Sequence, residues 1–285
     1  PNDQGLSVVT DSSLDSTTAD QGSLISFGKI YDVSGTGQVL VTSTIYGNDK
    51  PNLIIVYRED KGFYYRAQQI EAPSNTIGFG EALGISNDGM TIAIGAPYDD
   101  DQKLDQGMVL IYKQVNGSFQ LTQTLNSPNN DRAEMFGFAL QFDGNTLAVT
   151  ARNGDSIIKT TFDTFTQPLT GYVLDKSSTP TQTPTVFDNQ FTSFQNVNEN
   201  SGTVYLYENS EAGLLYGQTI NVDNTNVNYF GRNILSRRNH LYIGLPALVN
   251  NDTTGRLINY RKNINEQIYS NYRVAKDPVD VTKIK

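Results

Sequence analysis

The sequence predicts an all-β protein made of four successive units, each with four antiparallel strands. A Phe-Gly pair recurs four times along the 285 residues, and alternating apolar and polar segments follow each pair at similar spacing. Gly-containing and Asn-Asp turns separate these segments. The composition agrees with this fold, because 13 Phe, 16 Tyr and 37% hydrophobic residues are enough for a sizeable core.

Each unit is expected to open with a hairpin that begins at its Phe-Gly pair. These pairs are Phe27-Gly28, Phe79-Gly80, Phe136-Gly137 and Phe230-Gly231. The second strand of each hairpin has a period of two residues and is predicted at 39–45, 91–96, 146–151 and 240–245. The last interval between the pairs is the longest, so we place an insertion in the third unit.

The second half of each unit supplies two more strands. A third strand that ends near a Tyr is predicted at 53–57, 108–112, 203–207 and 256–260. After a short turn, a fourth strand is predicted at 63–70, 119–125, 214–220 and 267–275. Four antiparallel strands in roughly 50 residues are typical of one blade of a β-propeller.

The repeated residues resemble the FG-GAP repeat of integrin α-subunit propellers, which also occurs in bacterial and phage surface proteins. The second unit matches best, with Phe79-Gly80, the run Ile92-Ala93-Ile94-Gly95-Ala96-Pro97, and Gly107. The fourth unit keeps Gly244-Leu245-Pro246. The first and third units depart from the pattern, with Ser43-Thr44-Ile45 and Thr150-Ala151-Arg152 at that place.

The resemblance implies a propeller of more than four blades, so we expect these four to be part of a larger ring. The chain begins at Pro1 without a Met, and we expect it to be a piece of a longer protein. Alternatively, the two chain ends supply strands of further blades. The predicted divisions are 1–26 (edge of a preceding blade), 27–78 (blade one), 79–135 (blade two), 136–229 (blade three, insertion 153–201) and 230–285 (blade four and exit strand).

Composition excludes several classes of function. The chain has no Cys and one His, which excludes disulfides, thiolate zinc sites and multi-histidine metal centres. The net charge of −9 and the pI near 4.6 argue against nucleic acid as a partner. No apolar run has the length of a membrane span, so we expect no membrane insertion.

We expect no metal and no cofactor. The calcium loop of the integrin-type repeat, with its series of Asp residues, is not carried over, because the corresponding turns are too short. The only dense acidic cluster is a weak candidate for a cation, and we expect it to be a solvated loop. It consists of Asp99, Asp100, Asp101 and Asp105.

The sequence also predicts that the chain is not an enzyme and has no catalytic residue. The first strands, which would line a central channel, offer mainly Asp32 and Glu81, and no ring of carboxylates emerges. His240 lacks a matching Ser and Asp pattern, so we expect an ordinary residue at the start of a strand. A hydrolase that acts on glycans stays as a weaker alternative.

The insertion and the charge distribution suggest a partner surface. Residues 1–219 hold 11 basic and 25 acidic side chains, whereas 220–285 hold 10 basic and 5 acidic ones. Five Phe in the insertion argue against simple disorder, and with two Arg of the basic end they are the partner-binding candidates. These are Phe162, Phe165, Phe187, Phe191, Phe194, Arg237 and Arg238. The segment could instead fold back as extra strands beside the third blade.

The leading expectation is a non-enzymatic structural module of a phage virion, in a tail, fibre or neck protein. The Thr-x-Phe-Asp runs at 160–163 and 185–188 are similar to those in virion proteins of tailed phages. Its partners would be other virion subunits, the remainder of a longer parent chain, or a glycan or protein of the host surface. The alternative is an adhesin propeller that is secreted or displayed on a cell surface.

Overall fold

The structure is a computed structural model of the chain. It describes residues 24–46, 52–100, 104–129, 134–154, 156–159, 186–187, 190–191, 195–198, 202–210, 212–221, 230–237, 239–245, 256–263 and 268–274. Within these ranges the regular secondary structure is strand only. In this part of the chain no helix has the length and apolar character that crossing a membrane would require.

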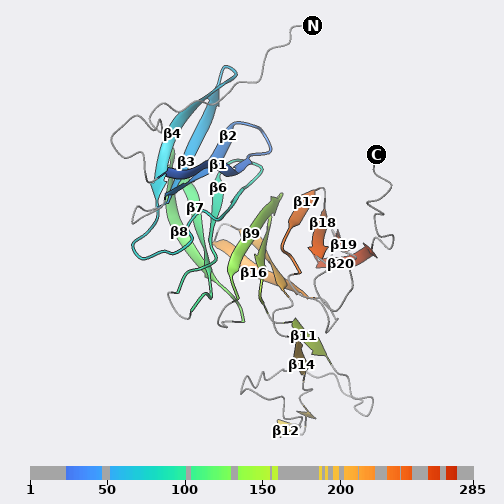
Figure 1. The fold of residues 1–285 in the computed structure, drawn as a ribbon. Coiled ribbons are helices and arrows are strands. Elements are labelled where there is room, and N and C mark those ends of the chain that lie inside the picture. The colour runs from blue at the N-terminus through green and yellow to red at the C-terminus, as the bar shows by residue number, and fades with distance from the viewer. Residues whose placement is uncertain are drawn as a thin grey trace, which may run out of the picture.

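Four antiparallel sheets, each of four strands in chain order, make up the body of the protein (Figure 1). Sheet I contains β1 (Leu24–Val33), β2 (Val39–Tyr46), β3 (Leu53–Asp60) and β4 (Phe63–Glu71). Sheet II contains β5 (Ala82–Ile85), β6 (Thr91–Ala96), β7 (Met108–Val115) and β8 (Ser118–Asn126). Sheet III contains β9 (Phe136–Asp143), β10 (Thr146–Ala151), β15 (Thr203–Ser210) and β16 (Gly213–Ile220). Sheet IV contains β17 (Ile234–Arg237), β18 (His240–Leu245), β19 (Arg256–Asn263) and β20 (Ile268–Val274).

The all-β prediction is confirmed, and the four sheets follow the four predicted units. One boundary differs: β1 begins at Leu24, ahead of Phe27, because Leu24 pairs with Tyr46 and lengthens the ladder. The first sheet therefore includes residues that the sequence assigned to the separate segment 1–26.

The sheets pack on one another in chain order through three clusters of buried apolar side chains. The first cluster joins sheets I and II, the second joins II and III, and the third joins III and IV. Along one side, β1 contacts β5, β5 contacts β9 and β9 contacts β17. Every residue of β6 and β10 is buried, whereas most residues of the outer strands β4 and β8 are not.

A β-bulge lies at the same place in all four sheets, where the fourth strand passes the Tyr of the third. In sheet I the pairing shifts between Val56↔Gln68 and Tyr57↔Arg66, which leaves Ala67 without a partner on β3. The residues at this place in the other sheets are Thr122, Gly217 and Tyr272. A bulge bends its strand and increases its twist. Its recurrence shows that the four sheets are copies of one unit.

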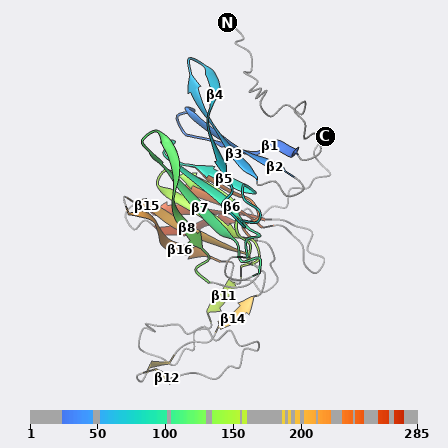
Figure 2. The same ribbon diagram turned by 90° about the vertical axis from the view of Figure 1, so that its left-hand side faces the viewer.

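The insertion in the third unit forms two small sheets of its own. Strand β11 (Ser156–Lys159) pairs with β14 (Gln195–Asn198), and β12 (Val186–Phe187) pairs with β13 (Gln190–Phe191). Neither pair joins sheet III. Figures 1 and 2 show β11 and β14 extending away from the four sheets, with β12 farther out. The described strands therefore do not fold back as additional strands of the third sheet.

Candidate functional site

The Phe of the second, third and fourth repeats lies at the junction of two sheets. Phe79, Phe136 and Phe230 are at most 1% exposed, and each belongs to the cluster that its own sheet shares with the preceding one. Phe136 also packs against Tyr205, with ring centroids 5.6 Å apart. For Phe27 the structure describes the backbone in β1 only. These rings therefore join neighbouring sheets.

The Gly that follows each Phe adopts a positive φ, between +73° and +88° at Gly28, Gly80, Gly137 and Gly231. At Gly137 a Cβ atom would also lie 2.8 Å from the carbonyl oxygen of Met108. The backbone of the preceding sheet passes that close only because a side chain is absent at Gly137. The Phe136-Gly137 pair thus combines a buried ring with a close approach of two backbone segments.

Two glutamines tie the outer strands of neighbouring sheets together. Gln68 on β4 donates to the carbonyl oxygen of Phe119 (2.8 Å) and accepts from its N–H (2.7 Å). Gln123 on β8 makes the same pair of bonds with Leu214, both at 2.9 Å. Sequence reasoning missed these residues. Their signal is a Gln two positions before the last buried aliphatic residue of the fourth strand, which also occurs at Gln218.

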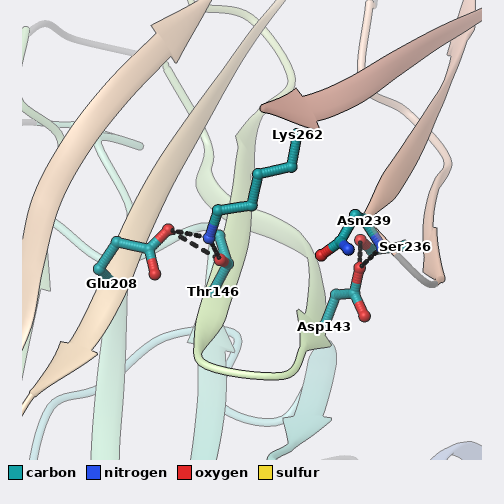
Figure 3. Close-up of polar contacts among 6 residues, drawn as sticks. All are labelled: Asp143, Thr146, Glu208, Ser236, Asn239 and Lys262. Atoms are coloured by element: carbon teal, nitrogen blue, oxygen red, sulfur yellow. Dashed lines mark hydrogen bonds and ion pairs between the residues drawn. The ribbon is translucent and has the colours of Figure 1, made fainter. Parts of the chain in front are cut away.

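Charged groups connect sheets III and IV (Figure 3). Lys262 on β19 is 9% exposed and donates to Glu208 Oε1 (2.8 Å) and to Thr146 Oγ1 (2.7 Å). Asp143 accepts from Ser236 Oγ (3.1 Å) and from the N–H of Asn239 (2.9 Å). The low exposure and the multiple partners fit a positioning role between sheets, because a buried charge is tolerated only when it is paired.

The described carboxylates of the acidic loop bind separate backbone groups. Asp99 is buried and accepts from the N–H of Ile77 (3.1 Å), and Asp100 accepts from the N–H of Asp105 (2.7 Å). Asp101 lies outside the described residues. Among the described residues there is no group of three or more His, Cys, Asp or Glu that could hold a metal ion. The loop instead binds backbone groups, and its Asp99 is buried rather than solvated as expected.

Asp32 and Glu81, the two acids predicted on first strands, lie in different surroundings. Asp32 on β1 accepts from the N–H of Ile85 in sheet II (2.9 Å) and from that of Val33 (2.8 Å). Burial raises the pKa of Asp32, and the two N–H donors partly oppose this. Glu81 lies just before β5 and is half-buried. Asp32 is thus a link between sheets I and II.

His240 lies close to a Ser and an Asp without forming a triad. Ser236 Oγ contacts the backbone carbonyl of His240 (3.3 Å) and the carboxylate of Asp143. The imidazole Nδ1 is 3.1 Å from Asn259 Oδ1, and the ring stacks on Tyr242. Because neighbouring residues of a strand face opposite sides, the ring and the Ser hydroxyl lie on opposite faces of sheet IV. A nucleophile and base arrangement does not form here.

A buried acid, Glu134, lies near two tyrosines of the second cluster, and no pattern in the sequence indicates this group. Glu134 is 1% exposed, and Tyr205 is fully buried. Burial raises the pKa of the Tyr205 and Tyr207 hydroxyls, and the negative charge of Glu134 adds to the effect. Tyr205 lies 3.5 Å from Ser127 Oγ. Both tyrosines are therefore protonated at neutral pH and serve in packing.

The predicted partner-binding residues are only partly described. Arg237 is exposed at the end of β17, and Phe187 and Phe191 lie on β12 and β13, where the structure describes the backbone. The others lie outside the described residues: Phe162, Phe165, Phe194 and Arg238. The structure does not bring Arg237 and the two Phe positions together. β17 belongs to sheet IV, whereas β12 and β13 belong to the insertion of the third unit, which we call the extension (β11 to β14).

Comparison with known proteins gives no family. No family model and no curated protein matches the sequence. Among solved structures, the chain is similar to acylaminoacyl peptidase from Pyrococcus horikoshii (10% identity, TM-score 0.44) over 91% of this chain and 34% of that one. It is also similar to the tricorn protease (11%, 0.40; 88% and 22%) and to a putative 6-phosphogluconolactonase from Bacteroides fragilis (14%, 0.28; 85% and 83%).

These comparisons correct one expectation. The three similar structures are of enzymes, and this contradicts the prediction that the chain is not an enzyme. The chain spans about a third of the length of the acylaminoacyl peptidase. At these identities and TM-scores, the similarity assigns neither a reaction nor a substrate to this chain.

Proposed function

We propose that this chain is an interaction module of a tailed-phage virion, in a tail, fibre or neck. In this proposal the four sheets are consecutive blades of an FG-GAP-type propeller and form an arc of a larger ring. The ring is completed by other subunits or by the remainder of a longer parent chain. The extension from sheet III contacts neighbouring subunits or the host surface.

The observation that carries the proposal is the contrast between the body and its extension. Within the body, the polar groups described above bind each other or the backbone of the next sheet, as Gln68, Gln123 and Lys262 do. This gives a rigid support. The extension begins with the β11–β14 pair and leaves the body instead of joining its sheet (Figure 2). A projecting segment on a rigid support is the usual arrangement of a binding loop.

Labelling of purified particles tests the virion role. Antibodies against the chain, detected with gold by electron microscopy, should mark a tail, neck or fibre. If the protein were absent from purified particles and recovered instead from the secreted or cell-surface fraction of an uninfected producer, the virion role would be wrong.

A deletion tests the role of the extension. Replacing residues 156–198 with a short Gly-Ser turn should leave the melting temperature within about 3 °C, because the extension adds no strand to sheet III. Incorporation into particles should fall. The matched control keeps β11 and β14 and replaces only residues 160–194. Normal incorporation of both variants would remove the extension from the interface, and loss of folding would show that the body depends on it.

A further inference from the structure

An Asn or Asp directly before a Gly occurs at four places in the chain, and the structure holds these side chains in different ways. Such a pair is chemically labile, because a Gly has no side chain to keep its main-chain nitrogen away from the carbonyl carbon of the preceding side chain. The four pairs are Asp88-Gly89, Asn116-Gly117, Asp143-Gly144 and Asn153-Gly154. All of them lie within the described residues.

The two Asp side chains are engaged by neighbouring groups. Asp88 accepts from Ser86 Oγ (2.5 Å) and from the N–H of Met90 (2.9 Å). Asp143 accepts from a hydroxyl and an N–H of sheet IV, as described above. An ionised carboxylate is also a poorer electrophile than an amide, because it carries a negative charge and lacks the ammonia leaving group. These two pairs are therefore protected by structure and by chemistry.

Asn153 is held at the start of the extension. Its Nδ2 contacts the sulfur of Met135 (3.6 Å), and its Oδ1 is buried. The N–H of Gly154, which would have to attack the Asn153 side chain, donates instead to the carbonyl oxygen of Ala151 (3.1 Å). Reaction at this pair therefore requires local opening of the body.

Asn116 lies in the two-residue turn between β7 and β8, where Val115 pairs with Ser118. The φ angles of Asn116 and Gly117 are +51° and +87°, as a type I′ hairpin turn requires. Both residues are exposed to solvent. Neither the Asn116 side chain nor the N–H of Gly117 has a hydrogen bond to any described residue. Of the four pairs, this one alone combines an amide side chain with an exposed, unbonded attacking nitrogen.

The equivalent turn of sheet I shows that the Asn is not needed for the turn itself. Lys61 and Gly62 occupy the same two positions between β3 and β4, with φ angles of +52° and +86°. There the N–H of Gly62 donates to the side chain of Glu59. Gln114 takes the place of Glu59 in sheet II, and no such bond forms to Gly117 among the described residues. The second turn therefore lacks the bond that holds the Gly N–H in the first.

We propose that Asn116 is the site at which this chain deamidates spontaneously, without an enzyme. The main-chain nitrogen of Gly117 attacks the side-chain carbonyl carbon of Asn116 and loses its proton, and the side-chain nitrogen leaves as ammonia. Water then opens the five-membered succinimide at one of its two carbonyl carbons, which gives either aspartate or isoaspartate. The reaction consumes only water, and it does not depend on the proposed virion role.

The isoaspartate product would change the end of the hairpin. It adds one atom to the main chain of the turn, whereas the pairing of β7 with β8 depends on the length of this turn. Phe119, the second residue of β8, also binds Gln68 of sheet I through its N–H and its carbonyl oxygen. Modification of Asn116 should therefore loosen the hairpin next to a link between sheets I and II.

Ageing of the purified protein tests the site. After incubation in mildly alkaline buffer, peptide mass spectrometry and labelling by an isoaspartate methyltransferase locate the product. We expect Asn116 to react at least about tenfold faster than Asn153 in the folded protein, because only Asn153 must first be released. In urea the two rates should lie within about threefold of each other, because both pairs are then unfolded. A folded-state rate at Asn153 equal to or above that at Asn116 would overturn the proposal, and so would reaction of Asn116 in urea only.

The turn of sheet I supplies the matched variant. Asn116→Lys copies the Lys61-Gly62 turn, so it should keep the melting temperature within about 2 °C and remove the isoaspartate signal of this peptide. Hydrogen exchange of Ser118 and Phe119 should then become faster with age in the wild type and stay constant in the variant. An equal rise in both proteins would show that deamidation of Asn116 is not what loosens the hairpin.

Discussion

The repeat Phe residues show how one side chain can join two sheets. Phe136 has no exposed surface and contacts residues of sheets II and III in one cluster. Its neighbour Gly137 turns the chain with a φ of +88°, so the ring enters the cluster while the backbone crosses close to β7. Burial of the ring and freedom of the backbone are therefore both required at this junction.

Truncation of Phe136 should be costly. We expect Phe136→Ala to lower the free energy of unfolding by about 3–5 kcal/mol, because it removes apolar contacts and leaves a cavity. The matched control is Phe63→Ala, since Phe63 is 72% exposed and its truncation should change stability by less than about 0.5 kcal/mol. Urea denaturation of both variants measures the difference, and equal losses would contradict the assignment.

Asp32 should make stability depend on pH. Its pKa is raised in the folded protein, so its contribution is complete at low pH, where the carboxyl is protonated in both states, and is lost as the pH rises through the folded pKa. We therefore expect the unfolding free energy of wild type minus that of Asp32→Asn to decrease between about pH 3 and 7. Denaturant titrations across this range measure it. An increase would show that the N–H donors outweigh burial.

At the scale of elements, the interfaces between sheets combine apolar contact with polar links between equivalent strands of neighbouring sheets. Asp32 links β1 to β5, Gln68 links β4 to β8, and Gln123 links β8 to β16. Apolar contact is not directional, whereas a Gln that binds both an N–H and a carbonyl fixes the position of one strand on the next.

Removing a Gln link should destabilise one interface. Gln123→Leu leaves the N–H and carbonyl of buried Leu214 without their partners, which should cost about 1–3 kcal/mol of unfolding free energy. Gln123→Glu keeps the acceptor and should lose less. The control is Gln120→Leu, an exposed position on the same strand. An equal effect of the Leu variants at both positions would mean that the link contributes nothing.

The acidic loop should not make the protein dependent on a metal. The carboxylates of Asp99 and Asp100 accept backbone N–H groups, so they stabilise the loop without an ion. We expect EDTA to change the melting temperature by less than about 2 °C in differential scanning calorimetry. A large decrease that added calcium reverses would place a cation in this loop.

At the scale of the whole molecule, the protein is a series in which each sheet contacts its chain neighbours. Three separate clusters join four sheets, and each cluster contains side chains of two consecutive sheets. Stability in such an arrangement is close to a sum of unit and interface contributions. Within the described residues sheet IV is the last of the series, and its Leu257 is 48% exposed.

Hydrogen exchange should follow this arrangement. Amides of β6 and β10, which are buried along their whole length, should exchange most slowly. Amides of the outer strand β4 should exchange faster, because most of its residues are exposed and no described strand pairs with its outer edge. Mass spectrometry of deuterium uptake measures this order. Equal protection of the amides in all strands would contradict the predicted order of exchange rates.

The sequence alone was enough to predict the all-β class, the four units, and the places of nearly all strands in the four sheets. Periodicity of two, turn residues and the recurring Phe-Gly pair are local signals, and they act within a few residues of the element they specify. The burial of Phe79, Phe136 and Phe230 also follows from them, because a repeated apolar ring beside a Gly needs a neighbouring copy to cover it.

Tertiary structure decided which polar side chains cross from one sheet to the next. Gln68 and Phe119 are far apart in the chain, and so are Lys262 and Thr146, so no local pattern identifies them as partners. The same holds for Asp99, whose carboxylate turned out to bind a backbone N–H instead of solvent. The exposure of Leu257 depends on the packing as well, because the equivalent Val109 is covered by sheet III, whereas no described sheet follows sheet IV.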